Sequence, residues 1–410
     1  MPIVQDMLFL SQRLPYPPNK GDKIRSFNIL KHFARSYRIH LGCFIDDPAD
    51  WEHVPALQQY CVDTCILPLN KTMAKVRSLQ AFLTGDPLNL PYFHSAALGR
   101  WTDKVLADVK PRAAFAFSSQ MAQFLLNARP RPERIVIDYC DVDSDKWRQY
   151  AASCNWPMNW VYNREGRTLL EYDRMVARAI DAGTFVADQE VSLFNSLSPD
   201  TAAKIHAVGN GIDTQYFAPD DDYPDPYGAG GPVLIFTGAM DYWPNIDAVT
   251  WFASDIFPAV RAAIDGARFY IVGSNPSGDV EKLTQREGVF VTGRVPDMRP
   301  YLRHAHAAVT PMRIARGVQN KVLEAMAMAK PTVTTPSALA GIDAIPDREI
   351  IVAEGAEDFI LKTIFALQDT ASATVGNNGR AFVLRECSWE TRLAGYDSLF
   401  RQCGKDLAAG

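Results

Sequence analysis

Hydrophobic residues occur along the chain in two alternating patterns. Short runs of β-branched and aromatic residues, typical of buried strands, alternate with longer stretches in which apolar residues recur every three or four positions, as in amphipathic helices. The alternation continues from one end to the other, and this order is typical of parallel sheets covered by helices. The sequence therefore predicts an α/β protein. The strands expected in the first half are residues 3–11, 39–45, 62–67, 113–117, 135–139, 184–187 and 204–208.

The pattern divides into two series. Residues 213–231 (DTQYFAPDDDYPDPYGAGG) are acidic, rich in proline and glycine and without periodicity, so we expect an exposed interdomain linker there. The first domain would span residues 1–212 and the second residues 232–385, with a C-terminal helix at 386–410 that could pack on the first domain. Two doubly wound domains facing each other would leave a cleft at the carboxyl ends of their strands, where such sheets bind ligands. The strands expected in the second half are residues 232–240, 267–274, 288–295, 305–312, 330–335 and 348–353.

Composition, charge and the absence of common motifs argue against several classes of protein. The chain has 410 residues, of which 47% are hydrophobic and 22% charged, and its formal net charge of −5 gives no electrostatic case for nucleic acid as a partner. Its seven cysteines have no CxxC spacing, which indicates neither a disulfide framework nor a zinc site. The sequence shows no secretory signal and no apolar run of membrane-spanning length, so we expect a cytoplasmic location. It also lacks GxGxxG and P-loop motifs.

The segment RGVQNKVLEAMAMAKPTVTT (316–335) carries the most specific candidate chemistry. It predicts a helix that begins around Gly317, directly after a strand, so that its first amides and positive dipole end attract an anion. Lys321 and Arg313 can reach the same phosphates, while Glu324, one turn beyond Lys321, can accept hydrogen bonds from the two hydroxyls of a ribose. Together these groups predict a nucleotide-sugar site. A surface ion pair at helical spacing is the alternative for this fragment alone.

Two motifs in order carry a resemblance to a known family. The segment AVGNGIDTQYFAP (207–219), followed by GVQNKVLEAMAMAKPTVTT (317–335), resembles the retaining glycosyltransferases of family 4 (group 1), which have the GT-B fold. The resemblance covers nearly the whole chain, with Asn210, Gly211, Asp213 and Phe217 matching the family's NGxD…F segment. It implies transfer of a sugar from a nucleoside diphosphate sugar to a glycan or lipid-linked hydroxyl, with retained configuration. The family's front-face mechanism uses the leaving diphosphate to accept the acceptor proton.

Taken together, the residues and the resemblance give the expected site. The groups expected to act on the reacting centre are Lys321, Arg313 and His94. Those expected to bind the donor are Glu324, Gly317, Val318, Asn320, Gly21, Gly238 and Arg294. Those expected near the acceptor are Lys20, Lys23, Arg25, Asp138 and Asp141. No cofactor and no metal are expected beyond the donor itself.

The sequence departs from the family pattern at two places. Arg316 stands where the family has the first of two glutamates, and the loop TGAMDYWPNID (237–247) lacks the usual Arg-Lys pair. Phosphate neutralisation is then expected from Arg313, Arg294 or Lys321, and the donor sugar is left open. Residues 238–252 (GAMDYWPNIDAVTWF) and 317–331 (GVQNKVLEAMAMAKP) resemble those of sugar transferases associated with exosortase and exopolysaccharide clusters in bacteria.

Several alternatives stay open at this stage. Asp141, Asp143 and Asp145 mimic a DxD metal motif, but Asp145 or Ser144 could equally cap a helix, and a helix-end phosphate site makes a divalent ion unnecessary. A sugar-nucleotide epimerase of the same fold and a non-catalytic sugar-nucleotide-binding protein are the competing functions. Aromatic and basic residues cluster within 147–167, which suits either internal packing or peripheral contact with a membrane. They are Trp147, Trp156, Trp160, Tyr162, Arg148, Arg164 and Arg167.

Overall fold

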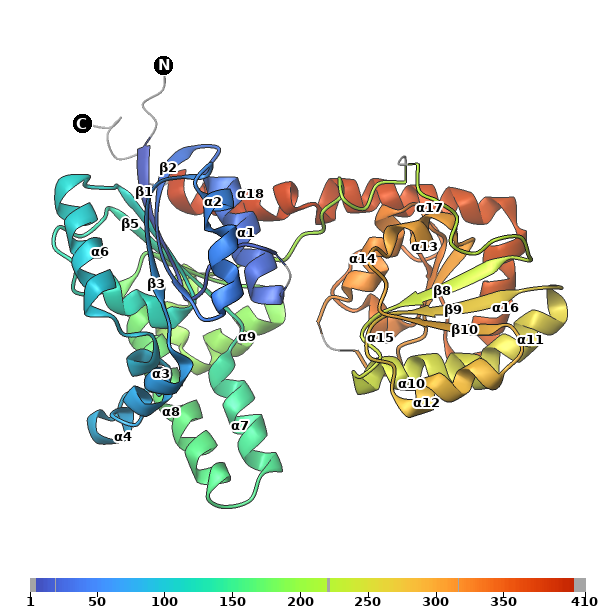
Figure 1. Ribbon diagram of the computed structural model, residues 1–410, viewed down its shortest axis with the longest axis horizontal. Coiled ribbons are helices and arrows are strands. Elements are labelled where there is room, and N and C mark those ends of the chain that lie inside the picture. Colours follow the sequence, from blue (N-terminus) through green and yellow to red (C-terminus); the bar gives the residue numbers. More distant parts are fainter. Residues whose placement is uncertain (1–4, 19, 220–221, 316, 402–410) are drawn as a thin grey trace. The chain divides into compact units, whose positions relative to one another are not determined.

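The computed structural model describes residues 5–18, 20–219, 222–315 and 317–401, and it divides the chain into two units. The first unit contains residues 1–210 and 392–410, and the second contains residues 211–391. Each unit is built on one parallel sheet with helices along it (Figure 1). The α/β class predicted from the alternating pattern is therefore confirmed.

The first unit has a seven-stranded sheet of order β3-β2-β1-β4-β5-β6-β7. Its paired strands are all parallel. Each strand lies at one of the seven positions expected from the sequence, although residues 3 and 4 of the first lie outside the described residues. The strands are β1 (Gln5–Ser11), β2 (Tyr37–Ile45), β3 (Cys61–Pro68), β4 (Ala113–Phe117), β5 (Arg134–Cys140), β6 (Ala182–Phe185) and β7 (Ile205–Ala207).

Helices follow most of these strands, and the first of them begins at Gly21. The two helices on either side of Pro157 are separated by a break at residues 154–157. The α-helices of this unit are α1 (Gly21–Phe33), α2 (Val54–Leu57), α3 (Lys71–Ser78), α4 (Ala81–Thr84), α5 (Asn89–Phe93), α6 (Ala96–Asp108), α7 (Asp143–Ser153), α8 (Met158–Ala179), α9 (Asp188–Leu197) and α18 (Trp389–Arg401).

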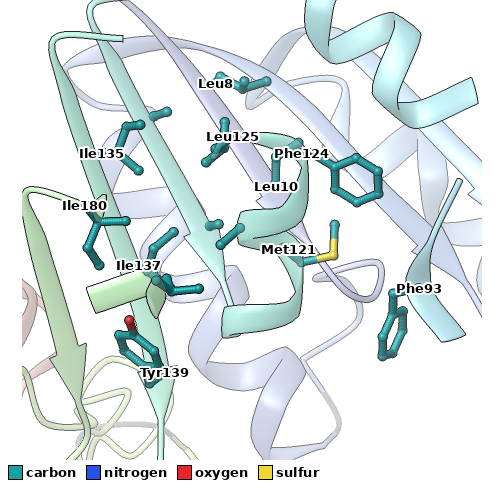
Figure 2. Packing of buried hydrophobic residues seen from close by; sticks show 14 of the residues in the cluster. Leu8, Leu10, Phe93, Met121, Phe124, Leu125, Ile135, Ile137, Tyr139 and Ile180 are labelled. Carbon is teal, nitrogen blue, oxygen red and sulfur yellow. The ribbon is translucent and has the colours of Figure 1, made fainter. Parts of the chain in front are cut away.

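The core of the first unit fills both faces of its sheet. Leu8 and Leu10 of β1 are fully buried on one face, where Figure 2 shows them with Met121 from the short helix that follows β4. Phe9 points to the opposite face and packs 5.0 Å from Phe115, measured between ring centroids. Burial on both faces explains why these strands read as continuous apolar runs rather than as alternating ones.

The C-terminal helix α18 completes the first unit. Tyr396 is fully buried, and its ring lies 5.5 Å from those of Phe33 and Phe115. Its hydroxyl lies 3.0 Å from the Thr184 hydroxyl of β6. The last helix therefore returns to the first domain, as the sequence suggested, and supplies part of its core.

The second unit has a six-stranded parallel sheet of order β10-β9-β8-β11-β12-β13. Its strands again lie within the expected segments. The strands are β8 (Val233–Thr237), β9 (Arg268–Val272), β10 (Val289–Gly293), β11 (Ala307–Thr310), β12 (Thr332–Thr334) and β13 (Ile351–Val352). The α-helices are α10 (Trp243–Trp251), α11 (Phe257–Ala263), α12 (Gly278–Lys282), α13 (Arg299–His304), α14 (Asn320–Ala327), α15 (Pro336–Leu339), α16 (Gly355–Gln368) and α17 (Thr370–Phe382).

Residues 213–231, expected to form an exposed interdomain linker, belong to the second unit, and most of those that the structure describes are exposed or half-buried. Phe217 and Tyr227 are buried in the second unit, where the Tyr227 hydroxyl donates to the Tyr301 carbonyl oxygen at 2.7 Å. The guanidinium of Arg299 lies 3.9 Å from the ring centroid of Tyr216. The aromatic residues between the prolines and acids gain buried area and cation–π contacts, which outweigh the polar composition of the segment.

The NGxD motif lies at the boundary between the units. Asn210 belongs to the first unit, and its side-chain oxygen accepts a hydrogen bond from Arg25 at 2.9 Å. Gly211 belongs to the second, where a Cβ would lie 2.4 Å from backbone atoms of Trp389, so only glycine fits. The next residue, Ile212, donates its amide to the Cys387 carbonyl oxygen at 2.8 Å. The boundaries expected at residues 212 and 386 thus lie at 210 and 391 in the structure.

Within the part of the chain that the structure describes, no helix has the length and apolar character needed to cross a bilayer.

Candidate functional site

A cavity of about 600 Å³ lies at the carboxyl edge of the second sheet. Thr237 ends β8, Val272 ends β9 and Arg294 follows β10, and all three line it. This is the edge at which open parallel sheets bind ligands, and the volume suits a small-molecule site. The lining residues are Thr237, Gly238, Ala239, Asn245, Val272, Gly273, Ser274, Asn275, Arg294, Val295, Met298, Val318, Asn320, Lys321 and Glu324.

Helix α14 begins three residues later than the sequence suggested. Gly317 has a φ of +63°, in the left-handed region, so the helix begins at Asn320. Val318 and Asn320 line the cavity, whereas Gly317 is not among its lining residues. The backbone amides expected to attract an anion at the helix start are therefore those near Asn320. The residue expected to replace the family's first glutamate, Arg316, lies outside the described residues.

Lys321 lies in the first turn of α14 and contacts neutral partners. Its Nζ donates to the side-chain oxygen of Asn245, lies 3.8 Å from the sulfur of Met312 and lies 4.7 Å from the ring centroid of Phe236. Burial lowers the pKa of Lys321 to about 8, and the Glu324 carboxylate only partly opposes this effect. A ligand that brought negative charge would find a cation here with little competing charge.

Glu324 lies one turn further along the same helix and also lines the cavity. Burial raises the pKa of Glu324 to about 7, and nearby Lys321 opposes the shift. Burial thus makes each of these two charged forms less favourable. Such perturbed groups in a cavity are candidates for a functional site, because a bound ligand can replace the hydration they lack.

Asn245 was not among the predicted site residues, although the loop that contains it was noted. Its side chain is buried, with the amide nitrogen donating to the Ala239 carbonyl oxygen at 2.8 Å and the oxygen accepting from Lys321. It thereby holds the Lys321 ammonium beside the loop that follows β8. Only its place after the first strand of the second domain could have indicated this role.

Gly238 and Gly273 bring two strand ends close together. A Cβ on Gly273 would lie 1.6 Å from the Gly238 carbonyl oxygen, and a Cβ on Gly238 would lie 2.7 Å from the Asn245 amide nitrogen. Gly238, a predicted residue, and Gly273, which the sequence analysis missed, thus keep side chains out of the cavity floor. Gly238 leaves space next to Lys321, because a Cβ there would lie 3.4 Å from the Lys321 Nζ, and Gly273 allows the two strand ends to approach each other.

The structure separates the two arginines expected to neutralise phosphate. Arg294 lines the cavity and is exposed. Arg313 is not among the lining residues; its Nε and Nη2 donate to both oxygens of Asp247, and its guanidinium lies 5.4 Å from the Trp251 ring. The cavity therefore contains Lys321 and Arg294 as predicted cations, and a role for Arg313 stays a prediction that requires release from Asp247.

The acceptor residues expected in the first unit include a buried ion pair. Arg25 donates to both carboxylate oxygens of Asp138, at 2.7 and 3.0 Å, and both side chains are buried. Burial lowers the pKa of Arg25, but the adjacent Asp138 carboxylate more than reverses this effect and raises it above its usual value. Arg25 also donates to Asn210 and to the Val208 carbonyl oxygen. These contacts favour a structural role for the pair.

The remaining residues expected near the acceptor differ in exposure. Lys23 is buried and paired with Asp50 at 2.6 Å, which again favours a structural role. Lys20 is exposed directly before α1, and Gly21 is the first residue of that helix. Asp141 pairs with Lys146 at 2.7 Å. For Lys20, Gly21 and Asp141 the predicted roles stay open.

The DxD-like segment lies at the start of α7. Asp143, like Asp141, pairs with Lys146. The helix begins at Asp143 with Val142 at its N-cap position, so neither Ser144 nor Asp145 caps it. Among the described residues, no group of three or more histidine, cysteine, aspartate or glutamate side chains is placed to hold a metal ion.

His94 lies just after α5 in the first unit, and its side chain is exposed. Its Nδ1 is 3.2 Å from the side-chain oxygen of Gln123, and the two residues line adjoining cavities of about 310 and 270 Å³. This places an imidazole beside open space, and its proposed role near the donor sugar stays a prediction.

Comparison with known families adds to this geometry. Residues 231–369 match the family model described as glycosyl transferases group 1. The match covers well under half of the chain but contains all of the residues that line the 600 Å³ cavity. No curated protein sequence matches the chain.

Solved structures resemble the whole chain at low sequence identity. Sucrose-phosphate synthase from Thermosynechococcus elongatus has a TM-score of 0.63 at 18% identity, covering 99% of this chain and 100% of that one. HepE from Anabaena, in complex with UDP, has a TM-score of 0.63 at 14% identity, covering 97% and 100%. WaaG, a glycosyltransferase involved in lipopolysaccharide biosynthesis, has a TM-score of 0.59 at 14% identity, covering 96% and 99%. With the two parallel sheets, these likenesses confirm the predicted GT-B fold of two Rossmann-like domains.

Proposed function

We propose that the protein is a glycosyltransferase that moves a sugar from a nucleoside diphosphate sugar to a hydroxyl of a glycan or lipid-linked acceptor. The proposal rests on one observation above all: a cavity at the carboxyl edge of the second sheet brings Lys321, Glu324 and Gly238 together. The family-model match over the same region supports it.

In the proposed donor complex, each cavity residue has a distinct task. The ionised Glu324 accepts hydrogen bonds from the two ribose hydroxyls. The diphosphate then lies next to the first turn of α14. Lys321 and Arg294 contact the phosphate oxygens, and the amides near Asn320 add donors at the positive end of the helix. The floor at Gly238 gives the ligand space to approach.

The proposed reaction retains configuration and uses no metal. The bond from the anomeric carbon to the diphosphate oxygen breaks as the acceptor oxygen bonds to that carbon on the same face. The acceptor proton passes to the departing diphosphate, whose developing charge Lys321 and Arg294 stabilise. No protein general base is needed. Lys321 and Arg294 thus help more in the transition state than in the bound donor, which is the condition for raising kcat, whereas Glu324 contributes to donor binding.

The class of donor and acceptor belongs to the same proposal. HepE has been solved with UDP and with UDP-glucose, which supports a uridine nucleotide as the first donor to test. We propose a role in bacterial exopolysaccharide synthesis on the resemblance of residues 238–252 described above. An epimerase would isomerise the donor without an acceptor, and a binding protein would neither transfer nor slowly hydrolyse it.

The proposal is tested by a thermal-shift screen against UDP-, GDP-, ADP- and dTDP-sugars. Saturation at about 100 times Kd adds about 2.7 kcal/mol of apparent stability, so the cognate donor will raise the Tm. Glu324→Ala removes the ribose contacts and is expected to abolish most of this shift and raise the donor KM. Glu357→Ala, an exposed glutamate of the same unit, serves as the matched control. Equal shifts in both variants, or no shift with any donor, would reject the site.

A further inference from the structure

Large apolar side chains are exposed on two helical segments of the first unit, α3–α4 and the α7–α8 pair, which meet where Phe82 contacts Trp160. Leu83 is 90% exposed, Trp156 is 81% exposed and Met73 is 65% exposed. Soluble proteins seldom expose contiguous apolar patches of this kind without a use for them. We refer to this surface as the apolar tip, formed by Met73, Val76, Leu79, Phe82, Leu83, Trp156, Met158 and Trp160.

The α3–α4 segment has a reversed amphipathic pattern. A helix on a globular protein ordinarily turns its large apolar side chains toward the core. Here the inward face buries small residues such as Ala74, Ser78 and Ala81. The outward face carries a stripe at spacings of three and four residues. The stripe consists of Met73, Val76, Leu79 and Leu83.

Ring contacts join the two helical segments into one surface. Phe82 stacks on Trp160 of α8 with centroids 6.0 Å apart and an interplanar angle of 11°. The guanidinium of Arg164 lies 4.7 Å from the Phe82 ring centroid and donates to the Ala81 carbonyl oxygen. Figure 1 shows α4 beside α8 at this end of the unit. The tip is therefore held in place by the fold.

The structure divides the aromatic cluster found in the sequence. Trp147 packs between α7 and α8, with its ring centroid 5.3 Å from that of Tyr162 and 5.9 Å from that of Tyr150. Trp156 and Trp160, by contrast, are more than half exposed. Internal packing thus accounts for Trp147 but does not explain why Trp156 and Trp160 are exposed.

Charge around the apolar tip is opposite to that of the chain as a whole. Residues 71–88 contain three cations and one anion, and residues 143–167 contain four cations and three anions, so both segments are net positive while the chain carries −5. Lys75, Arg148 and Arg167 are exposed on the same helices, with Arg148 4.0 Å from Asp145. Tryptophan and leucine flanked by lysine and arginine are the chemistry of helices that lie in the surface of an anionic bilayer.

We propose that the apolar tip inserts into the headgroup region of an anionic phospholipid bilayer and attaches the protein there as a peripheral protein. The apolar side chains supply buried area, and the surrounding cations supply electrostatic attraction. The inference depends only on the surface and would hold for any activity of the cavity. With the proposed function, it would bring the enzyme to lipid-linked acceptors.

The test is sedimentation of the full chain with vesicles. Vesicles of phosphatidylcholine and phosphatidylglycerol in equal parts are expected to bind the protein, and pure phosphatidylcholine much less, with binding weakened by salt. Leu83→Glu and Trp156→Glu are each expected to weaken binding by about tenfold or more, because burial of one large apolar side chain contributes about that much. Leu361→Glu, at a 67% exposed leucine of α16, is the matched control.

Three outcomes would overturn the proposal. One is no binding of the wild-type chain to the mixed vesicles. Another is an equal loss with Leu361→Glu. The third is a dimer, seen by light scattering, that Leu83→Glu converts to a monomer while vesicle binding is absent, since the apolar tip would then join two copies of the chain. Circular dichroism of each variant confirms that a loss of binding does not reflect unfolding.

Discussion

Lys321 and Glu324 owe their altered acidity to one cause, which is burial beside the same cavity. The pKa of the lysine falls to about 8 and that of the glutamate rises to about 7. Both would be partly neutral in the empty site near neutral pH. A diphosphate requires the protonated lysine and a ribose requires the ionised glutamate, so donor binding is coupled to proton exchange.

This coupling predicts a maximum of donor affinity between about pH 7 and pH 8. Affinity falls as pH rises through the Lys321 pKa, because the ammonium is lost, and falls as pH drops through the Glu324 pKa, because the carboxylate is protonated. Each limb approaches about tenfold per pH unit. Isothermal titration with the nucleotide sugar from pH 5.5 to 9.5 measures the profile.

Glu324→Gln provides the control for this profile. The acidic limb should disappear, while the alkaline limb should move to lower pH because Lys321 loses its neighbouring negative charge. A wild-type affinity that stays constant across the range would exclude a direct role for both groups.

Among the individual residues of the site, the sequence indicated the charged ones but not the uncharged ones that position them. Lys321 and Glu324 stand out because their spacing on a short apolar helix is unusual, and Arg294 follows a recognisable strand. Asn245 and Gly273 act through a buried amide and a close backbone approach, which depend on segments distant along the chain. Local sequence patterns therefore do not predict such contacts.

At the scale of elements, Arg25 connects parts of the first unit that are far apart in sequence. It lies on α1, pairs with Asp138 of β5, donates to Tyr396 of α18 at 3.3 Å and contacts Asn210 just before the boundary. A charged pair without solvent stabilises only if both partners remain, because either one alone keeps an uncompensated buried charge.

Arg25→Met is therefore expected to destabilise the protein by about 3–5 kcal/mol in urea unfolding. Adding Asp138→Asn should restore part of this loss, since no unpaired charge then remains. Arg100→Met, at an exposed arginine of α6, is the control and should change stability little. Normal stability of Arg25→Met with a raised acceptor KM would instead support the acceptor role expected from the sequence.

The sequence predicted strands better than boundaries and loops. Apolar runs identified each strand because parallel sheets bury both faces. The start of α14 was misplaced because the left-handed conformation of Gly317 precedes the helix. The attachment of residues 213–231 to the second unit was not predicted, because their many prolines and acidic residues gave no pattern that singled out Phe217 and Tyr227, which are buried. Arg25 was read as a cation for the acceptor because its partner lies 113 residues away.

At the scale of the whole molecule, the chain passes from one unit to the other twice, after residue 210 and after residue 391. The second unit is thus a continuous segment, and it contains every residue that lines the 600 Å³ cavity. The first unit is discontinuous, because α18 supplies Tyr396 to its core.

Fragments should therefore behave unequally. Residues 211–391 alone are expected to unfold cooperatively and to bind the nucleotide sugar with nearly the affinity of the full chain. Residues 1–210 alone are expected to lack cooperative unfolding, since they lose the buried Tyr396. Joining residues 392–401 to them through a short glycine–serine linker should restore it. A cooperative transition in the unlinked 1–210 fragment, measured by circular dichroism, would contradict this prediction.

The placement of residues 392–401 in the first unit also orders events on the ribosome. Proteins generally fold domain by domain as the nascent chain emerges, beginning with the amino-terminal one. Here the strands β1 to β7 emerge first, but α18, the last helix of their unit, is synthesised only after the whole of residues 211–391. The unit made first is thus the last to be completed, and the surface that Tyr396 covers at Phe33 and Phe115 stays open on the nascent chain until then.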